Sequence, residues 1–174
     1  MVFTIIGMAG CGKSCMGRAL SSRLKIKLID TDKLIERRMG KPLQTLIDEL
    51  GVDKFREIET EVLCSVYCKE GEHLIVSTGG SAVYSERGMA HLKSLGRVIY
   101  LFCGYETIRK RLGDFSKRGV VLKDGQTLYD LYNERMPLYA SYADVTVNCD
   151  GEAYPKYQRI AASAIKRILK ETEN

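Results

Sequence analysis

The chain has 174 residues, 45% apolar and 28% charged, which is the size and balance of one soluble domain with a real hydrophobic core. Its net charge of +5 is spread along the whole length, without the clustered basic residues or interleaved aromatics that are typical of nucleic-acid binders. No apolar run approaches the roughly 20 residues that a membrane span needs, and MVFTIIGMAG has no basic segment before its apolar run, so we expect a cytoplasmic protein without a signal peptide.

Strand and helix patterns alternate along the chain in the order that is typical of an α/β fold. Apolar runs predict strands at residues 2–7, 27–30, 73–78, 97–103 and 144–149. Periodicity predicts helices at residues 12–24, 32–40, 42–51, 53–71, 85–96, 105–113, 127–137 and 153–171. Thr31 can cap the second helix, and Pro137 is expected to end the seventh. The pattern predicts one domain over residues 1–174, with a five-stranded parallel sheet covered by helices on both faces.

Six cysteines are scattered along the chain, at positions 11, 15, 64, 68, 103 and 149, and none shows CxxC spacing. Cys64 and Cys68 lie four residues apart in a predicted helix and therefore share one face. A metal site there would need two more ligands, and the chain has only two histidines, His73 and His91. Buried, reduced cysteines are the favoured interpretation.

Residues 7–14 read GMAGCGKS, the GxxxxGK[ST] motif of a P-loop, placed after the first strand and opening a helix. Gly7, Gly10 and Gly12 allow the backbone to wrap a phosphate with its N–H groups pointing inward. Lys13 can reach the β- and γ-phosphates, and the Ser14 hydroxyl can ligate Mg²⁺. The motif predicts binding of a nucleoside triphosphate with magnesium, and leaves open whether water, a nucleotide or a metabolite receives the phosphate.

Two carboxylates follow the second strand, in LIDTD, where ligands of doubly wound sheets usually bind. Asp30 and Asp32 are two residues apart, so one can face a metal while the other faces an acceptor hydroxyl. The alternative is a solvated pair that caps the next helix.

The third strand ends in STGGSAV, residues 77–83. Many P-loop ATPases carry an acidic residue here that serves the metal, whereas this chain has Ser77 followed by Gly79 and Gly80. This difference argues against an enzyme that activates water and favours a backbone surface that a small ligand can approach. A plain strand-to-helix turn is the alternative.

Two arginines complete the candidate acceptor side. In FREIE, Arg56 and Glu59 are one helical turn apart, which would ordinarily indicate a weak surface ion pair. Arginine is also the residue best suited to forked recognition of a carboxylate. In NERMPLY, Arg135 stands two residues before Pro137.

Taken together, these segments resemble the shikimate kinases. GMAGCGKS, the DTD at 30–32, FREIE at 55–59, TGGS and NERMPLY at 133–139 occur in the family's order and at nearly its spacing. The resemblance runs the length of the chain and implies a P-loop fold with ATP and Mg²⁺, and a monomer. The charge pattern and the lack of a long apolar run predict that neither nucleic acid nor membrane is a partner.

On the acceptor side, the resemblance implies that Asp32 contacts the acceptor hydroxyl, often as the proposed base. It implies that Arg56 and Arg135 hold the acceptor's carboxylate, that Glu59 stands beside Arg56, and that the backbone of Gly79 and Gly80 meets the acceptor. Ser81 occupies the third position of this substrate-binding loop.

On the donor side, the resemblance implies that the P-loop residues contact ATP and that Asp30 serves the metal through water. These P-loop positions are Gly10, Cys11, Gly12, Lys13, Ser14 and Cys15. Arg111 would lie against adenine. The polar, aperiodic segment at about 113–126 would be a mobile lid, with Arg118 closing over the phosphates. Lys13, Asp32 and Arg118 are thus the expected catalytic residues.

The sequence departs from the family pattern at three places. Ser81 replaces the third glycine of the family's triplet and adds a hydroxyl. The lid reads Arg118-Gly119-Val120-Val121 where the family usually has Arg-Pro-Leu-Leu, so it loses a fixed φ and some apolar bulk. Cys15 replaces the customary second hydroxyl residue of the P-loop.

None of these departures removes a charged group. The sequence therefore predicts ATP-dependent phosphorylation of a hydroxyl on a small carboxylate metabolite, and the resemblance implies conversion of shikimate to shikimate 3-phosphate in chorismate biosynthesis. A paralogue acting on another small hydroxy acid would use the same arginines. A non-catalytic nucleotide-binding regulator would be expected to lack an acid or an arginine of this set, and all of them are present.

Overall fold

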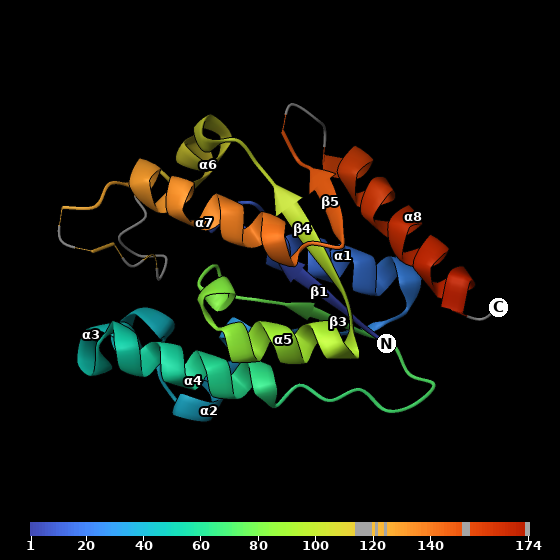
Figure 1. Cartoon of the computed structure of the whole chain (residues 1–174), viewed down its shortest axis with the longest axis horizontal. Helices are drawn as coiled ribbons and strands as arrows, with labels where there is room; N and C mark the ends of the chain where they lie inside the picture. The colour runs from blue at the N-terminus through green and yellow to red at the C-terminus, as the bar shows by residue number, and fades with distance from the viewer. Residues whose placement is uncertain (114–119, 121, 124, 151–153, 173–174) are drawn as a thin grey trace.

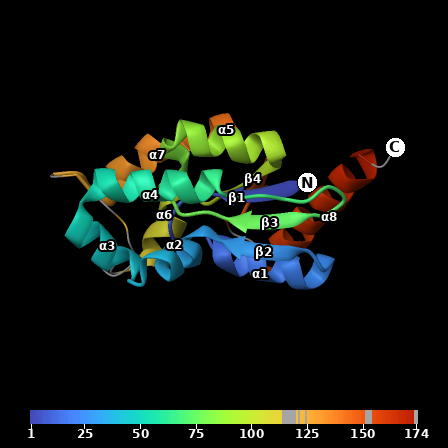
Figure 2. The same ribbon diagram turned by 90° about the horizontal axis from the view of Figure 1, so that it is seen from below.

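The computed structural model describes residues 1–113, 120, 122–123, 125–150 and 154–172. Five strands form one parallel sheet in the order β2-β3-β1-β4-β5. Figure 1 shows β3, β1, β4 and β5, and Figure 2 shows β2 beside β3. The strands are β1 (Val2–Ile6), β2 (Lys27–Asp30), β3 (Leu74–Ser77), β4 (Gly96–Phe102) and β5 (Val145–Asn148). The predicted strands and the predicted fold class are therefore confirmed.

Eight α-helices and one 3₁₀ turn are found in the described part of the chain. The helices are α1 (Lys13–Leu24), α2 (Thr31–Met39), α3 (Leu43–Leu50), α4 (Val52–Cys64), α5 (Glu86–Leu95), α6 (Tyr105–Leu112), α7 (Leu128–Tyr142) and α8 (Tyr154–Thr172), and the 3₁₀ turn is η1 (Ala82–Tyr84). None of the helices in these described ranges has the length and apolar character needed to span a membrane.

The core lies on both faces of the sheet. All five residues of the central strand β1 are buried, as expected for a parallel strand covered from both sides. Helices α1 and α8 contact each other and cover one face, while α5 and α7 pack on the other (Figure 2). Helices α2, α3 and α4 enclose a second, smaller apolar cluster built from Ile35, Leu46, Ile47, Phe55, Ile58 and Val62. This helical group carries Arg56 and Glu59.

The strand register brings three candidate segments to one edge of the sheet. Ser77 pairs with Ile5 of β1 and with Asp30 of β2, so the three strands end nearly level. The P-loop after β1, the DTD segment after β2 and the TGGS segment after β3 consequently meet at the carboxyl edge. This is where open α/β sheets bind their ligands.

Pro137 does not end the seventh helix, contrary to prediction, because α7 continues to Tyr142. Proline lacks the N–H that would bond to the carbonyl of Asn133, and both residues are exposed, so water can satisfy that carbonyl. The second half of the helix is held by Tyr139, which is fully buried and donates a hydrogen bond to the Gly80 carbonyl at 2.6 Å. Tertiary packing therefore outweighs the helix-breaking tendency of proline.

The helix predicted at 53–71 is too long, since α4 ends at Cys64. The Ser65 hydroxyl donates to the Val62 carbonyl at 2.8 Å, and His91 of α5 engages the Val66 carbonyl at 2.9 Å. These contacts replace helical hydrogen bonds. Cys68 therefore does not share a helical face with Cys64, and both thiols are half-buried rather than buried.

Thr31 is not the cap of α2, because Asp30 takes that position. The Asp30 Oδ1 accepts a hydrogen bond from the Lys33 N–H at 3.3 Å, and Thr31 is the first helical residue. Thr31 is fully buried, and its Oγ1 accepts from the Gly79 N–H at 3.3 Å. The hydroxyl therefore joins the start of α2 to the TGGS segment instead of capping the helix.

Candidate active site

The P-loop has the backbone that its glycines predict. Gly7, Gly10 and Gly12 have φ angles of +146°, +82° and +99°, a region that only glycine adopts easily. Gly12 is the N-cap of α1 and provides no side-chain hydrogen bond, which leaves the first-turn amides for an anion. Lys13 is 9% exposed, and its Nζ donates to the carbonyls of Gly7 at 2.8 Å and Met8 at 3.1 Å. The ammonium group is therefore held at the mouth of the phosphate cradle.

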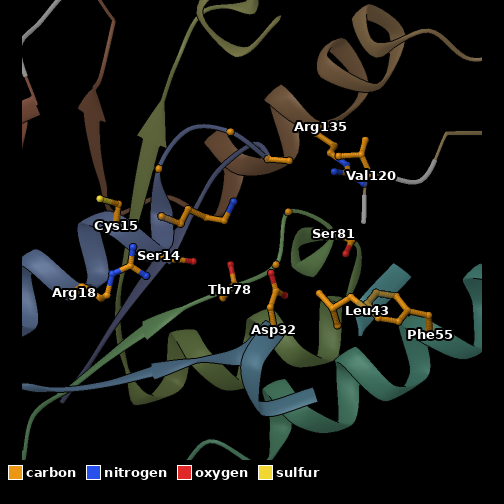
Figure 3. Close-up of a pocket in the computed structure, with 16 residues that line it drawn as sticks. Ser14, Cys15, Arg18, Asp32, Leu43, Phe55, Thr78, Ser81, Val120 and Arg135 are labelled. Carbon is orange, nitrogen blue, oxygen red and sulfur yellow. The ribbon is translucent and has the colours of Figure 1, made fainter. Parts of the chain in front are cut away.

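A single cavity of about 520 Å³ extends from the P-loop to the TGGS segment. Its donor end is lined by P-loop and α1 residues, namely Ala9, Gly10, Gly12, Lys13, Ser14, Cys15 and Arg18. Its other end is lined by Leu43, Phe55, Gly79, Gly80, Ser81, Val120 and Arg135. Figure 3 shows Asp32 and Thr78 between the two groups, with the Asp32 carboxyl group directed into the cavity. A donor and an acceptor could therefore meet beside Asp32.

Asp32 is half-buried, and its environment changes its acidity. Burial raises the pKa of the Asp32 carboxyl from 3.8 to about 6, while nearby Lys13 opposes this shift and nearby Asp30 adds to it. At neutral pH the group is mainly a carboxylate and can accept a hydrogen bond or a proton. Asp30, in contrast, is engaged at the N-terminus of α2 and is not among the residues that line the cavity.

The two glycines of TGGS leave room for acidic groups on either side. A Cβ atom on Gly79 would lie 2.5 Å from Glu59 Oε1 and 2.8 Å from Asp32 Oδ1. A Cβ atom on Gly80 would lie 3.2 Å from the Arg135 guanidinium and 3.3 Å from the backbone N of Ala9. Any side chain at Gly79 would therefore push against the carboxylates, and one at Gly80 would crowd the P-loop and Arg135.

Glu59 is a buried acid, whereas the sequence predicted it only as a neighbour of Arg56. It is 2% exposed, and its Oε1 accepts a hydrogen bond from the Ser81 hydroxyl at 3.0 Å. Burial raises the pKa of Glu59 from 4.5 to about 7, although the Ser81 hydrogen bond opposes this shift. The sequence held a signal for this burial, because Glu59 lies four residues after Phe55 on the apolar stripe of α4.

The two predicted arginines occupy different places. Arg135 is 4% exposed and lines the main cavity near Gly80. Arg56 is half-buried and instead lines a smaller neighbouring cavity of about 180 Å³, together with Tyr84 and Glu134. The structure therefore brings Arg135 into the main cavity and places Arg56 at its border.

Arg111 lies beside the P-loop, at the donor end. Its guanidinium donates to the carbonyls of Cys11 at 3.4 Å and Cys149 at 3.3 Å. Arg118 lies outside the described residues, as does most of the predicted lid at 113–126. Of that segment, Val120 is described and lines the main cavity.

Donor and acceptor elements that open into one cavity define a P-loop phosphotransferase acting on a small molecule. The family described as shikimate kinase matches residues 9–171. The chain belongs to the shikimate kinase family, and it is therefore an ATP-using kinase that phosphorylates a hydroxyl group.

Individual relatives agree with this assignment. A shikimate kinase of Francisella tularensis subsp. novicida is 35% identical over 149 residues, which cover 84% of each chain. A solved shikimate kinase from Acinetobacter baumannii, in complex with shikimate, matches with a TM-score of 0.81 and 28% identity, over 98% of this chain and 93% of that one. The shikimate kinase from Aquifex aeolicus matches with a TM-score of 0.77 and 26% identity, over 99% of this chain and 98% of that one.

Proposed function

We propose that this chain transfers the γ-phosphoryl group of ATP to a ring hydroxyl of shikimate, yielding shikimate 3-phosphate. The observation that carries the proposal is the shared cavity, in which Asp32 stands between the P-loop and an acceptor end containing Arg135. Family membership and the relatives that carry the name shikimate kinase support shikimate as the acceptor.

On the donor side, the P-loop amides and Lys13 would bind the phosphates of ATP. Phosphoryl transfer depends mainly on positioning and on neutralising charge that spreads over the transferring group. In this structure the Lys13 ammonium group donates hydrogen bonds to two loop carbonyls. When ATP binds, it can donate instead to phosphate oxygens, which carry more negative charge. Arg111 would lie against the adenine base, and Arg118 would supply further positive charge to the phosphates.

The residues near the P-loop fit a magnesium ion bound with ATP. Ser14 offers a hydroxyl on the cavity wall, and Asp30 keeps one carboxylate oxygen outside its capping hydrogen bond, so these two residues would hold the ion, Asp30 through water. Bound Mg²⁺ would neutralise charge on the β- and γ-phosphates. Among the described residues, no three acidic, histidine or cysteine side chains converge on one point.

On the acceptor side, Asp32 would orient the hydroxyl in line with the γ-phosphate and accept its proton. Its pKa of about 6 leaves it ionised at neutral pH but basic enough to assist the transfer. Arg135 and Arg56 would pair with the carboxylate of shikimate, which offsets the mutual repulsion of two nearby guanidinium groups.

Ser81 does not argue against shikimate. Its hydroxyl is already used as a donor to Glu59, so the additional polar group is satisfied within the protein. The cavity still has a volume of about 520 Å³ with Ser81 among the residues that line it. The third position of the loop therefore adds bulk without placing an unpaired donor against the ligand.

The test is an ATP-coupled turnover screen with shikimate, quinate, gluconate and small hydroxy amino acids at matched concentrations. We expect shikimate to have the highest kcat/KM, and the product to carry phosphate on a ring hydroxyl by NMR. Turnover of another acid in preference to shikimate would overturn the proposed acceptor. We also propose that the enzyme acts as a monomer, which sedimentation at the assay concentration tests directly.

A further inference from the structure

Tyr84 contacts both arginines assigned to the acceptor carboxylate. The guanidinium carbon of Arg56 lies 4.5 Å from the centre of the Tyr84 ring, and that of Arg135 lies 5.2 Å from it. Both distances fall within the range of a cation–π interaction, in which the electron-rich ring face attracts a cation. Neither the sequence motifs nor the family resemblance points to this residue.

The Tyr84 hydroxyl is also engaged. It donates a hydrogen bond to Glu134 Oε1 at 2.7 Å and accepts one from Arg135 Nε at 3.3 Å. The hydrogen bond from Tyr84 is the main reason that the pKa of Glu134 lies below its ordinary value. Tyr84 therefore has a fixed orientation, with its ring toward the arginines and its hydroxyl toward α7.

Glu134 extends this network to the segment that enters α7. Its Oε2 accepts from Gln126 Nε2 at 2.8 Å, and Lys123 Nζ lies 3.5 Å from both carboxylate oxygens. Lys123 and Gln126 belong to the C-terminal part of the predicted lid. A chain of contacts thus joins this part of the lid, through Glu134 and Tyr84, to Arg56 and Arg135.

The position of Tyr84 is not explained by core packing. The side chain is half-buried and belongs to neither of the two apolar clusters formed by the described residues. Its ring faces two cations, and its hydroxyl bonds to one carboxylate. Two arginines held close together repel each other. Glu59 interacts electrostatically with both, and an aromatic ring that attracts both further reduces the cost of keeping them in place.

We propose that Tyr84 is a positioning residue for acceptor binding: its ring holds Arg56 and Arg135 ready for the acceptor's carboxylate, and its hydroxyl secures the ring to Glu134. This inference rests on the proposed function, because it assumes an acceptor with a carboxylate. Prepositioned arginines lose less conformational freedom when the acceptor binds, so the benefit should appear in acceptor affinity.

The test compares three variants by steady-state kinetics with both substrates. Tyr84→Leu removes the ring, and we expect the acceptor KM to rise about tenfold while the KM for ATP stays within about twofold. Tyr84→Phe keeps the ring, and we expect the acceptor KM to stay within about threefold of wild type. Tyr67→Leu is the matched control, because Tyr67 is 72% exposed and the chemical change is the same.

A second arm separates positioning of the arginines from general damage. The methyl ester of shikimate lacks the negative charge, so Tyr84→Leu should change its kcat/KM by less than about threefold. Thermal unfolding of each variant shows whether it is folded, and binding of ATP to Tyr84→Leu shows whether the donor end is intact.

The experiment distinguishes failure of the Tyr84 inference from failure of the proposed function. Absence of shikimate turnover by the wild-type enzyme refutes the proposed acceptor, and the same KM comparison is then made with whichever carboxylate acid the screen identifies. The Tyr84 inference is overturned if Tyr84→Leu leaves the acceptor KM unchanged, if the ester loses as much activity as the acid, or if Tyr84→Phe is as impaired as Tyr84→Leu.

Discussion

The P-loop and the TGGS segment both place glycines beside the cavity, but for different physical reasons. Gly12 of the P-loop has φ +99°, and a Cβ atom there would meet no described heavy atom within 4 Å. Gly79 has no positive φ, but its Cβ atom would lie 2.5 Å from Glu59 Oε1. Gly12 is therefore needed for its backbone conformation, and Gly79 for the absence of a side chain.

This difference has a chemical consequence. In the proposed function, the donor would bind through backbone amides, whose directions depend on φ and ψ. The acceptor would bind beside Asp32 and Arg135, and a side chain at Gly79 would press on the carboxylates of Asp32 and Glu59. Substitutions on the two sides should therefore separate ATP binding from acceptor binding.

The largest expected effect is that of Asp32→Asn. The amide keeps the size of the side chain but cannot accept the proton, so kcat should fall by about 10²- to 10⁴-fold. ATP binding, measured by isothermal titration calorimetry, should stay within about threefold because the P-loop is untouched. A variant that retains wild-type kcat would contradict the role of Asp32.

A pair of glycine substitutions tests the comparison directly. Gly79→Ala should lower kcat/KM for the acceptor about 100-fold, because the new methyl group overlaps Glu59 and Asp32. Gly12→Ala should instead weaken ATP binding about tenfold, because alanine disfavours φ +99° by roughly 1–2 kcal/mol. If each variant weakened ATP binding and lowered the acceptor kcat/KM to the same extent, the two loops would not act separately.

Arg56→Ala is expected to act on acceptor binding alone. Loss of a charge-assisted hydrogen bond to the carboxylate should raise the acceptor KM about tenfold, with kcat within about threefold. The KM for ATP is the internal control. An unchanged acceptor KM would mean that Arg56, which borders the main cavity, does not reach the carboxylate.

A further expected effect concerns stability and its dependence on pH. The pKa of Glu59 is about 7 in the folded protein, against 4.5 for the free group, so the folded state binds the proton more tightly than the unfolded state. The free energy of unfolding should therefore fall as pH rises from about 4.5 to 7, and remain lower above that pH. Asp32 adds a similar trend between pH 4 and 6.

Glu59→Gln removes the charge and keeps an oxygen that can accept from Ser81. We expect the variant to gain about 1–3 kcal/mol in free energy of unfolding at pH 8, and little at pH 4.5. Urea denaturation at both pH values measures the difference. The matched control is Glu57→Gln on the exposed face of the same helix; if both variants change equally, the burial of Glu59 is not the cause.

Prediction from sequence was most successful where chemistry is local. GMAGCGKS predicted both the loop conformation and the position of Lys13, because eight consecutive residues specify a strand, a turn and a helix N-terminus. The prediction that Pro137 ends its helix was wrong. The helix is held by a hydrogen bond between Tyr139 and Gly80, two residues that lie 59 positions apart in the sequence. The burial of Glu59 was visible in the helical pattern, but its partner Ser81 was not.

The sequence alone determined the class of fold, the donor site and the set of charged residues available for an acceptor, because periodicity and short motifs depend on neighbours along the chain. Only the tertiary structure decided that Gly79 separates Glu59 from Asp32, that Arg135 enters the cavity while Arg56 borders it, and that Tyr84 contacts both. These contacts join α2, the segment after β3, η1, α4 and α7. Their distances follow from how the helices pack on the sheet, which no local pattern specifies.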